Sequence, residues 1–295
     1  MNAGFWLALV AGLVWSVGNI SHKLLASRFV RSPFFMLVIF SSMALVVGAG
    51  MFLFEPQVMD GPDLSMVAVA AVTYLLAIYF YLRAMATEEA SRVVPLFAIG
   101  TVMIVILGAI FLGEVFSIVQ YLGIFFIISG SVIISIQGRL FSFIRSRLLG
   151  LMSLAGLFFA VNALLVKKIL ASHSFVQTFS HLSIIEGMIG LAVAAVLFPQ
   201  VREVFNRISY RHIFLNAVTD LMGIGAEFIY TMALSLWYLS LVETVASLQY
   251  AFIFVWTLVI SRFKPSLFME DISRRVIIQK SISIILIVIG IYLIV

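Results

Sequence analysis

Long apolar runs separated by short polar or proline-marked breaks extend along the whole chain. Each run is about 20 residues long, the length that a helix needs to cross a bilayer. In the first half, the predicted helices cover residues 4–26, 33–54, 64–87, 91–112 and 117–137. In the second half they cover residues 147–170, 176–198, 212–237, 241–261 and 275–295. The pattern therefore predicts an all-α polytopic membrane protein with ten transmembrane helices.

An odd number of spans in each half requires the two halves to enter the membrane in opposite directions. This predicts two inverted five-helix repeats, one in residues 1–140 and one in 141–295. The repeats share a faint similarity: Gly12-Leu13-Val14-Trp15-Ser16-Val17 with Lys23 aligns with Gly156-Leu157-Phe158-Phe159-Ala160-Val161 with Lys167 at the same spacing. Chance identity in apolar sequence is the alternative explanation.

Composition agrees with a membrane protein and narrows the chemistry. Hydrophobic residues make up 63% of the 295 residues and charged residues 11%, whereas soluble domains carry about 25% charged residues. The net charge of +5 comes from basic residues in short loops without a basic patch, so we expect a lipid bilayer and no nucleic acid as partner. Cysteine is absent and the four histidines have no ligand spacing, so we expect no metal and no cofactor.

The distribution of positive charge predicts the orientation of the chain. Of the 18 lysines and arginines, all but Lys167 and Lys168 lie at the first, third, fifth, seventh or ninth loop. Cytoplasmic loops collect lysine and arginine. We therefore expect these odd-numbered loops inside and both termini outside, in a bacterial or archaeal cytoplasmic membrane.

Three short motifs in the first half resemble the drug/metabolite transporter superfamily, in particular its EamA-type members. They are Ala90-Ser91-Arg92-Val93-Val94-Pro95-Leu96 at the start of the fourth span, Gly113-Glu114 at its end, and Gln120-Tyr121-Leu122-Gly123 followed by Gly130 in the fifth. The resemblance implies a ten-helix transporter. Most members keep both termini in the cytoplasm, opposite to the orientation that the charges predict here. Their substrates range from amino acids to lipid-linked sugars, so the resemblance names no substrate.

Two glutamates near the middle of predicted spans are candidates for a transport site. Glu186 lies in the seventh span and Glu227 in the eighth, where an ionisable side chain is costly and usually functional. A polar stripe on one face of the eighth span contains Asn216, Asp220 and Glu227. It predicts a path for a solute or for protons, and a structural stripe bonded to neighbouring helices is the alternative.

Further candidates lie on other spans and at one turn. Ser16, Asn19 and Lys23 share a face of the first span, and this face predicts part of a cavity. For Lys23 an interfacial anchor is the alternative role, because the residue lies close to the end of the span. In the sixth span, which is the first span of the second repeat, Asn162 and Lys167 are further candidates for the cavity wall. Charged residues at the turn after the third span predict either an intracellular gate or a solvated turn; they are Arg83, Glu88, Glu89 and Arg92.

These features favour a secondary transporter of a small metabolite that works by alternating access, as a monomer or homodimer. The chain has no GxxxxGK[ST] phosphate loop, so solute exchange and proton coupling are the two candidate driving forces. A flippase for a lipid-linked headgroup is the main alternative. An intramembrane enzyme is disfavoured because HExxH is absent and because Arg92 follows Glu88-Glu89 one residue too soon for the prenyl-protease motif.

Overall fold

A computed structural model describes residues 2–30, 32–88, 93–135, 147–263 and 274–294, and these residues fold into helices without strands. The first half contains α1 (Ala3–Leu24), a π-helical turn (Leu25–Phe29), α2 (Pro33–Phe52), α3 (Gly61–Thr87), a 3₁₀ turn (Val94–Phe97), α5 (Ala98–Leu112) and α6 (Ile118–Ser135). The second half contains α8 (Arg147–Ile169), α9 (Phe175–Val196), α10 (Phe198–Arg207), α11 (Tyr210–Leu236), α12 (Leu239–Ala246), α13 (Gln249–Phe263) and α14 (Arg274–Ile294).

Most described helices are apolar enough to cross a membrane. Among the described residues, seven segments meet both the length and the composition of a membrane span. Three further apolar helices are shorter, at Ala98–Leu112, Ile118–Gly130 and Ile278–Leu293. The prediction of a helical membrane protein is therefore confirmed at this level.

Local signals in the sequence set several helix ends. Ser32 caps α2 by accepting a hydrogen bond from the Phe35 N–H at 3.3 Å, and Pro33 occupies the first turn. Ser174 caps α9 in the same way through the Gln177 N–H at 3.1 Å. Gly113 ends α5 with a φ of 66°, a left-handed conformation that glycine adopts without strain. These caps explain why the predicted and observed ends differ by only a few residues.

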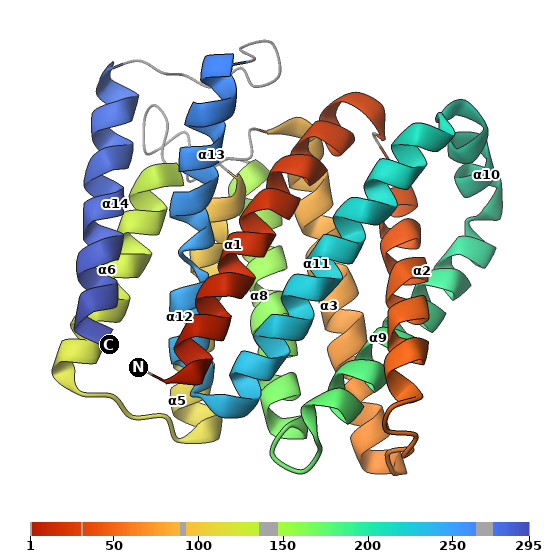
Figure 1. The fold of residues 1–295 in the computed structure, drawn as a ribbon, viewed down its shortest axis with the longest axis horizontal. Coiled ribbons are helices and arrows are strands. Elements are labelled where there is room, and N and C mark those ends of the chain that lie inside the picture. The colour runs from red at the N-terminus through yellow and green to blue at the C-terminus, as the bar shows by residue number, and fades with distance from the viewer. Residues whose placement is uncertain (1, 31, 89–92, 136–146, 264–273, 295) are drawn as a thin grey trace.

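The helices pack as pairs that join the two halves of the chain. α1 packs against α11, α2 against α9, α3 against α8, and α6 against α14. In Figure 1, α6 and α14 stand together at one edge, whereas α2, α9 and α10 form the opposite edge. The marked N and C ends lie close together, toward the end of the bundle that carries the turns around residues 113–117 and 170–174.

The fourth and ninth predicted spans are not continuous α-helices. The fourth begins as the 3₁₀ turn Val94–Phe97, which contains Pro95. The ninth divides into α12 and α13 at Ser247 and Leu248, where hydrogen bonds of the i to i+3 type replace the α-helical pattern. Where the structure forms α10, the sequence predicted a loop. The many polar residues of this segment hid, in the sequence, the apolar helix face made by Val201, Val204 and Phe205.

Glycines allow the closest helix crossings. A Cβ added at Gly12 would lie 2.6 Å from the Ala246 carbonyl oxygen on α12, and one at Gly156 would lie 2.8 Å from the Gly100 nitrogen on α5. A Cβ at Gly190 would lie 2.1 Å from the Ser41 side chain, so α9 approaches α2 equally closely. Small residues at such crossings are typical of helices packed in membranes.

Candidate solute cavity

A cavity lies between the helices near the middle of the bundle. Its empty volume is about 820 Å³, including the part open at its mouth, which falls within the usual range of small-molecule sites. Its lining comes from α1, α2, α3, α8, α11, α12, α13 and the 3₁₀ turn. Tyr74 and Gly223, two of its lining residues, are the central residues of α3 and α11. The cavity therefore lies near the level where a transporter binds its substrate.

Aromatic rings form a continuous row along the cavity. Neighbouring ring centroids in this row are 5.1 to 6.2 Å apart, a normal spacing for interacting aromatic side chains. In order, the rings are those of Trp15, Tyr230, Phe159, Phe97, Tyr81 and His22. All of them except Tyr230 line the cavity.

Asp220 is the centre of a polar cluster at one wall. Its Oδ1 lies 2.9 Å from Nε2 of His22 on α1, and its Oδ2 accepts a hydrogen bond from the Asn216 Nδ2 at 2.5 Å. Asp220 and Asn216 are buried. The Oδ1 of Asn216 has no hydrogen-bond donor among the described residues. The predicted stripe on the eighth span therefore reaches the cavity through Asp220, with His22 as its partner.

The first span contributes Asn19 to the cavity wall. Asn19 donates to the Gln249 Oε1 at 2.9 Å and accepts from the Tyr81 hydroxyl at 2.6 Å. Ser16, one turn earlier, is fully buried and accepts from the indole N–H of Trp256 at 3.0 Å. Asn19 therefore lies in the cavity, whereas Ser16 joins α1 to α13 beside it.

Two glutamates lie at or next to the cavity. Glu243 on α12 lines it and accepts hydrogen bonds from Thr101 at 3.1 Å and from the Tyr230 hydroxyl at 2.9 Å. Glu227 on α11 accepts from the hydroxyl of Tyr74, which lines the cavity, at 3.3 Å. Glu227 is thus separated from the cavity by one side chain.

Glu186 and Asn162, two further sequence candidates, also lie outside the cavity. Glu186 is buried on α9, on the helix that packs against α2, and has no hydrogen bond to a described residue. Asn162 donates to the Ala70 carbonyl on α3 at 3.0 Å and joins α8 to α3.

Lys23 and Lys167 make corresponding contacts in the two halves. The Lys23 ammonium donates to the carbonyls of Met85 and Glu88 at the end of α3. The Lys167 ammonium donates to the carbonyls of Leu234 and Trp237 at the end of α11, at 2.5 and 2.8 Å. A cation at a helix C-terminus stabilises the exposed carbonyls and the helix dipole.

The predicted gate is described only in part. Arg83 donates to the Tyr79 hydroxyl at 3.4 Å and its guanidinium lies 5.7 Å from the centre of the Tyr79 ring. The Glu88 backbone carbonyl accepts from Lys23. Glu89 and Arg92 lie outside the described residues.

Several cavity residues were not predicted as site residues from the sequence. Glu243 lies close to one end of the predicted span 241–261, and His22 is one of the four histidines without ligand spacing. An interrupted span is a known sign of a binding site in transporters, and the interruption after Ala246 would have drawn attention to Glu243. The sequence carries no Gly or Pro at that break, so the signal was absent.

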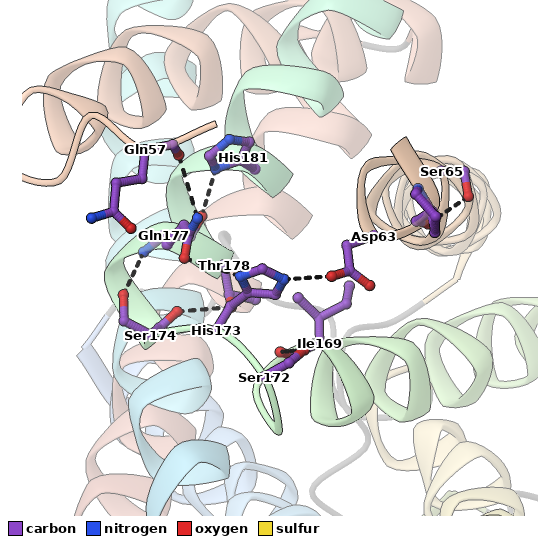
Figure 2. Close-up of polar contacts among 11 residues, drawn as sticks. Gln57, Asp63, Ser65, Ile169, Ser172, His173, Ser174, Gln177, Thr178 and His181 are labelled. Carbon is purple, nitrogen blue, oxygen red and sulfur yellow. Dashed lines mark hydrogen bonds and ion pairs between the residues drawn. The ribbon is translucent and has the colours of Figure 1, made fainter. Parts of the chain in front are cut away.

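A second polar cluster joins turns at the end of the bundle near residues 170–174. Figure 2 shows the His173 ring pointing toward Asp63, with Nε2 and Oδ2 2.7 Å apart. The Gln177 side chain contacts the other nitrogen of His173 at 3.1 Å and donates to the Gln57 carbonyl at 3.4 Å. The Ser174 hydroxyl donates to Glu55 at 2.6 Å. The turn between α8 and α9 is thereby bound to the first turn of α3 and to the segment before it.

The apolar helices and the central cavity, which is lined mainly by aromatic and other apolar side chains with a few polar groups, define an integral membrane protein with a buried solute-sized site. Residues 2–136 match the EamA-like transporter family. The match covers the first predicted repeat, so the resemblance seen in the motifs is confirmed for these residues.

Two further comparisons extend this result. A curated relative described as an uncharacterized transporter in the cobO 3' region, from Sinorhizobium sp, is 38% identical over 56 residues. The match covers 19% of this chain and 40% of that relative. A solved crystal structure of another protein aligns with a TM-score of 0.67 at 14% identity, over 99% of this chain and 98% of the other. This last likeness concerns the fold alone.

Proposed function

We propose that this protein is a secondary transporter that carries a small solute across the membrane by alternating access. The observation that carries the proposal is the cavity at the helix centres, lined by residues from both halves of the chain. A site at the boundary of two repeats can be opened to either side when one repeat moves against the other. The transporter-named relative and the EamA-like family support the same class.

The proposal includes ten spans in two inverted repeats, residues 1–140 and 141–295. The pairing of helices supports it. If α1 and α3 are replaced by their counterparts α8 and α11 in the other repeat, and the reverse, the α1–α11 contact becomes the α8–α3 contact, which is also present. α3 and α11 also have the same length, 27 residues. Lys23 and Lys167 contact carbonyls at equivalent positions of these two helices.

Glu227 is the side chain that we propose for proton coupling, with Glu186 as a neighbouring acidic group. Acidic side chains inside membrane bundles serve as proton relays in many transporters. The Tyr74 hydroxyl connects Glu227 to the cavity. A change in the charge of Glu227 would therefore change the binding of a solute in the cavity. Proton uptake measured with Glu227→Gln and Glu186→Gln in proteoliposomes tests this: unchanged uptake in both variants would exclude coupling through these groups.

The absence of cysteine from the chain allows a direct test of alternating access. Gly18 and Gly223 line the cavity, and a Cβ at either position would meet no atom within 4 Å. Gly18→Cys and Gly223→Cys therefore place a single thiol in the cavity without a clash. In proteoliposomes, we expect a membrane-impermeant thiol reagent to label each variant when it is added on either side.

Gly225→Cys is the matched control, because Gly225 is also uncrowded on α11 but does not line the cavity. It should react slowly from both sides. If the cavity thiols react from one side only, alternating access is wrong. If they react from both sides while the vesicles also leak small ions, the protein is a channel rather than a carrier.

The proposed orientation places both termini outside and the arginine-rich loops in the cytoplasm. Val58 in the segment before α3 is 75% exposed, and Asn206 is exposed on α10. An impermeant reagent on intact cells should label Val58→Cys, and should label Asn206→Cys only after the cells are permeabilised. The opposite result would place the termini inside, as in most relatives of the superfamily.

A further inference from the structure

The cavity wall combines aromatic faces with hydrogen-bond acceptors. Five of the rings in the row beside it line the cavity, and Phe40 and Tyr74 add two more, with centroids 5.8 Å apart. Aromatic faces carry a negative electrostatic potential and attract cations that lie within about 6 Å. The apolar wall is therefore suited to a positively charged group as well as to a hydrocarbon surface.

The charges at the wall have the matching sign. Asp220 and Glu243 line the cavity, and His22 is the only basic side chain among the described lining residues. His22 already contacts Asp220. Glu243 receives hydrogen bonds from neutral donors, Thr101 and Tyr230, and has no basic partner among the described residues. A buried carboxylate without a cation is costly, so a cationic ligand beside Glu243 would remove that cost.

Two tyrosine hydroxyls of the wall already donate to acceptors of the protein itself. The Tyr81 hydroxyl donates to Asn19 and the Tyr74 hydroxyl donates to Glu227. The Asn216 Oδ1 next to Asp220 has no donor among the described residues. The two hydroxyls therefore do not face a bound anion, whereas the carboxylates of Asp220 and Glu243 at the wall favour a cationic ligand.

Lysines of neighbouring segments do not change this balance. The Lys23 ammonium lies at the carbonyls of Met85 and Glu88. The Lys280 ammonium lies 4.9 Å from the centre of the Phe254 ring on α13. Neither lysine lines the cavity.

We infer that the solute of this transporter is an organic cation: an amine or a quaternary ammonium compound with an apolar or aromatic body. The inference rests on the proposed transport function, because it assigns a substrate class to the same cavity. The ammonium group lies between Asp220 and Glu243, and the apolar body lies against the aromatic row.

The test compares three probes of similar size and different charge. They are benzyltrimethylammonium, benzyl alcohol and phenylacetate, with tetramethylammonium as a smaller cation. We expect benzyltrimethylammonium to slow the alkylation of Gly18→Cys and Gly223→Cys by about tenfold or more at saturation, and to raise the melting temperature of the protein. Benzyl alcohol and phenylacetate should give no such protection.

The carboxylate variants show which group binds the cation. Glu243→Gln should weaken benzyltrimethylammonium binding by about tenfold or more, whereas Glu203→Gln, on the exposed face of α10, should bind as the unmodified chain does. The thiol-protection measurement uses intact carboxylates, so it decides the question even if Glu243→Gln fails to fold.

The inference is overturned if phenylacetate or benzyl alcohol protects as well as benzyltrimethylammonium, or if neither cation protects. It is also overturned if a folded Glu243→Gln variant binds with unchanged affinity. Labelling of the cavity thiols from both sides would leave the transport proposal standing in each of these cases. Conversely, one-sided labelling with selective cation protection would contradict alternating access and keep the cation site.

Discussion

At the scale of single residues, Glu114 joins the two halves of the chain at the start of α12. Its carboxylate accepts hydrogen bonds from the backbone N–H groups of Leu239 at 2.7 Å and Ser240 at 3.0 Å, and from the Ser240 hydroxyl. It is 3% exposed. A carboxylate at a helix N-terminus satisfies donors that the helix itself leaves unpaired.

Replacing Glu114 by Gln should therefore lower the free energy of unfolding by about 1 to 3 kcal/mol, because a buried donor loses its acceptor. Thermal unfolding of the detergent-solubilised protein measures this loss. Glu203→Gln is the comparison, since the Glu203–Arg207 pair is exposed and such pairs contribute below about 1 kcal/mol. Equal effects of the two substitutions would contradict the capping role of Glu114.

His173 introduces a pH dependence at the turn between α8 and α9. The hydrogen bond to Asp63 raises the pKa of His173 above its usual value of 6.5. A group whose pKa is raised on folding stabilises the protein fully below its unfolded pKa, and this contribution is lost as the pH rises through the folded pKa. We therefore expect the melting temperature to fall as the pH increases from about 6 through the raised pKa.

The Asp63→Asn variant should lose most of this change, whereas His212→Gln should retain it, because His212 stacks on Phe29 away from Asp63. Melting curves between pH 5 and pH 9, within the usual range of histidine titration, provide the measurement. A pH profile that stays the same in Asp63→Asn would show that the His173–Asp63 pair does not produce it.

The sequence predicted some cavity residues and missed others for a physical reason. Asn19 and Asp220 were found because a polar residue inside an apolar helix is visible from the sequence alone. Trp15 and Phe97 were not, because an aromatic residue in an apolar span looks the same whether it contacts lipid or a cavity. The ring of Trp15 meets that of Tyr230 where α1 packs against α11, and the ring of Phe97 meets that of Phe159 where the 3₁₀ turn packs against α8.

At the scale of helices, close crossings at glycines hold the halves together. Gly156 on α8 faces Gly100 on α5, and Gly150 on the same helix has open space around it. Gly156→Ala should lower the free energy of unfolding by about 1 to 3 kcal/mol, because the added methyl group pushes two backbones apart. Gly150→Ala should be neutral or raise it by up to about 1 kcal/mol through helix propensity.

Unfolding of the two variants in the same detergent measures the difference, and the shared helix removes most other causes. A Gly156→Ala protein as stable as Gly150→Ala would mean that α5 and α8 do not cross as closely as described.

Helix positions were predictable where long apolar runs had clear ends. The third predicted span, 64–87, differs from α3 by three residues at its start, because Pro62 and Asp63 form the first turn of the helix instead of the preceding loop. The division between α12 and α13 was not predictable, since tertiary contacts and not a Gly or Pro produce it. α10 was missed because hydropathy averaged over a window hides a short amphipathic helix.

At the scale of the whole molecule, the two lysine contacts lie at opposite ends of the bundle. Lys23 binds α1 to the end of α3, and Lys167 binds α8 to the end of α11. α1 and α8 are equivalent in the proposed repeats, and so are α3 and α11. In the proposed alternating-access mechanism, each lysine would therefore stabilise closure at one end of the cavity.

Removing one of these contacts should favour opening at that end alone. In a Gly223→Cys background, Lys23→Met should increase the ratio of labelling from the side of the α1–α2 turn to labelling from the opposite side. Lys167→Met should decrease the same ratio, because it loosens the other end. Changes of about fivefold correspond to a shift of about 1 kcal/mol in the equilibrium between the two states.

The opposite signs distinguish this prediction from a general loss of stability, which would increase labelling from both sides together. Lys168→Met is the matched control, since the Lys168 ammonium lies 5.3 Å from the centre of the Phe111 ring and Lys168 directly follows Lys167 in the chain. If Lys23→Met and Lys167→Met changed the ratio in the same direction, the two ends would not be equivalent and the inverted-repeat mechanism would be wrong.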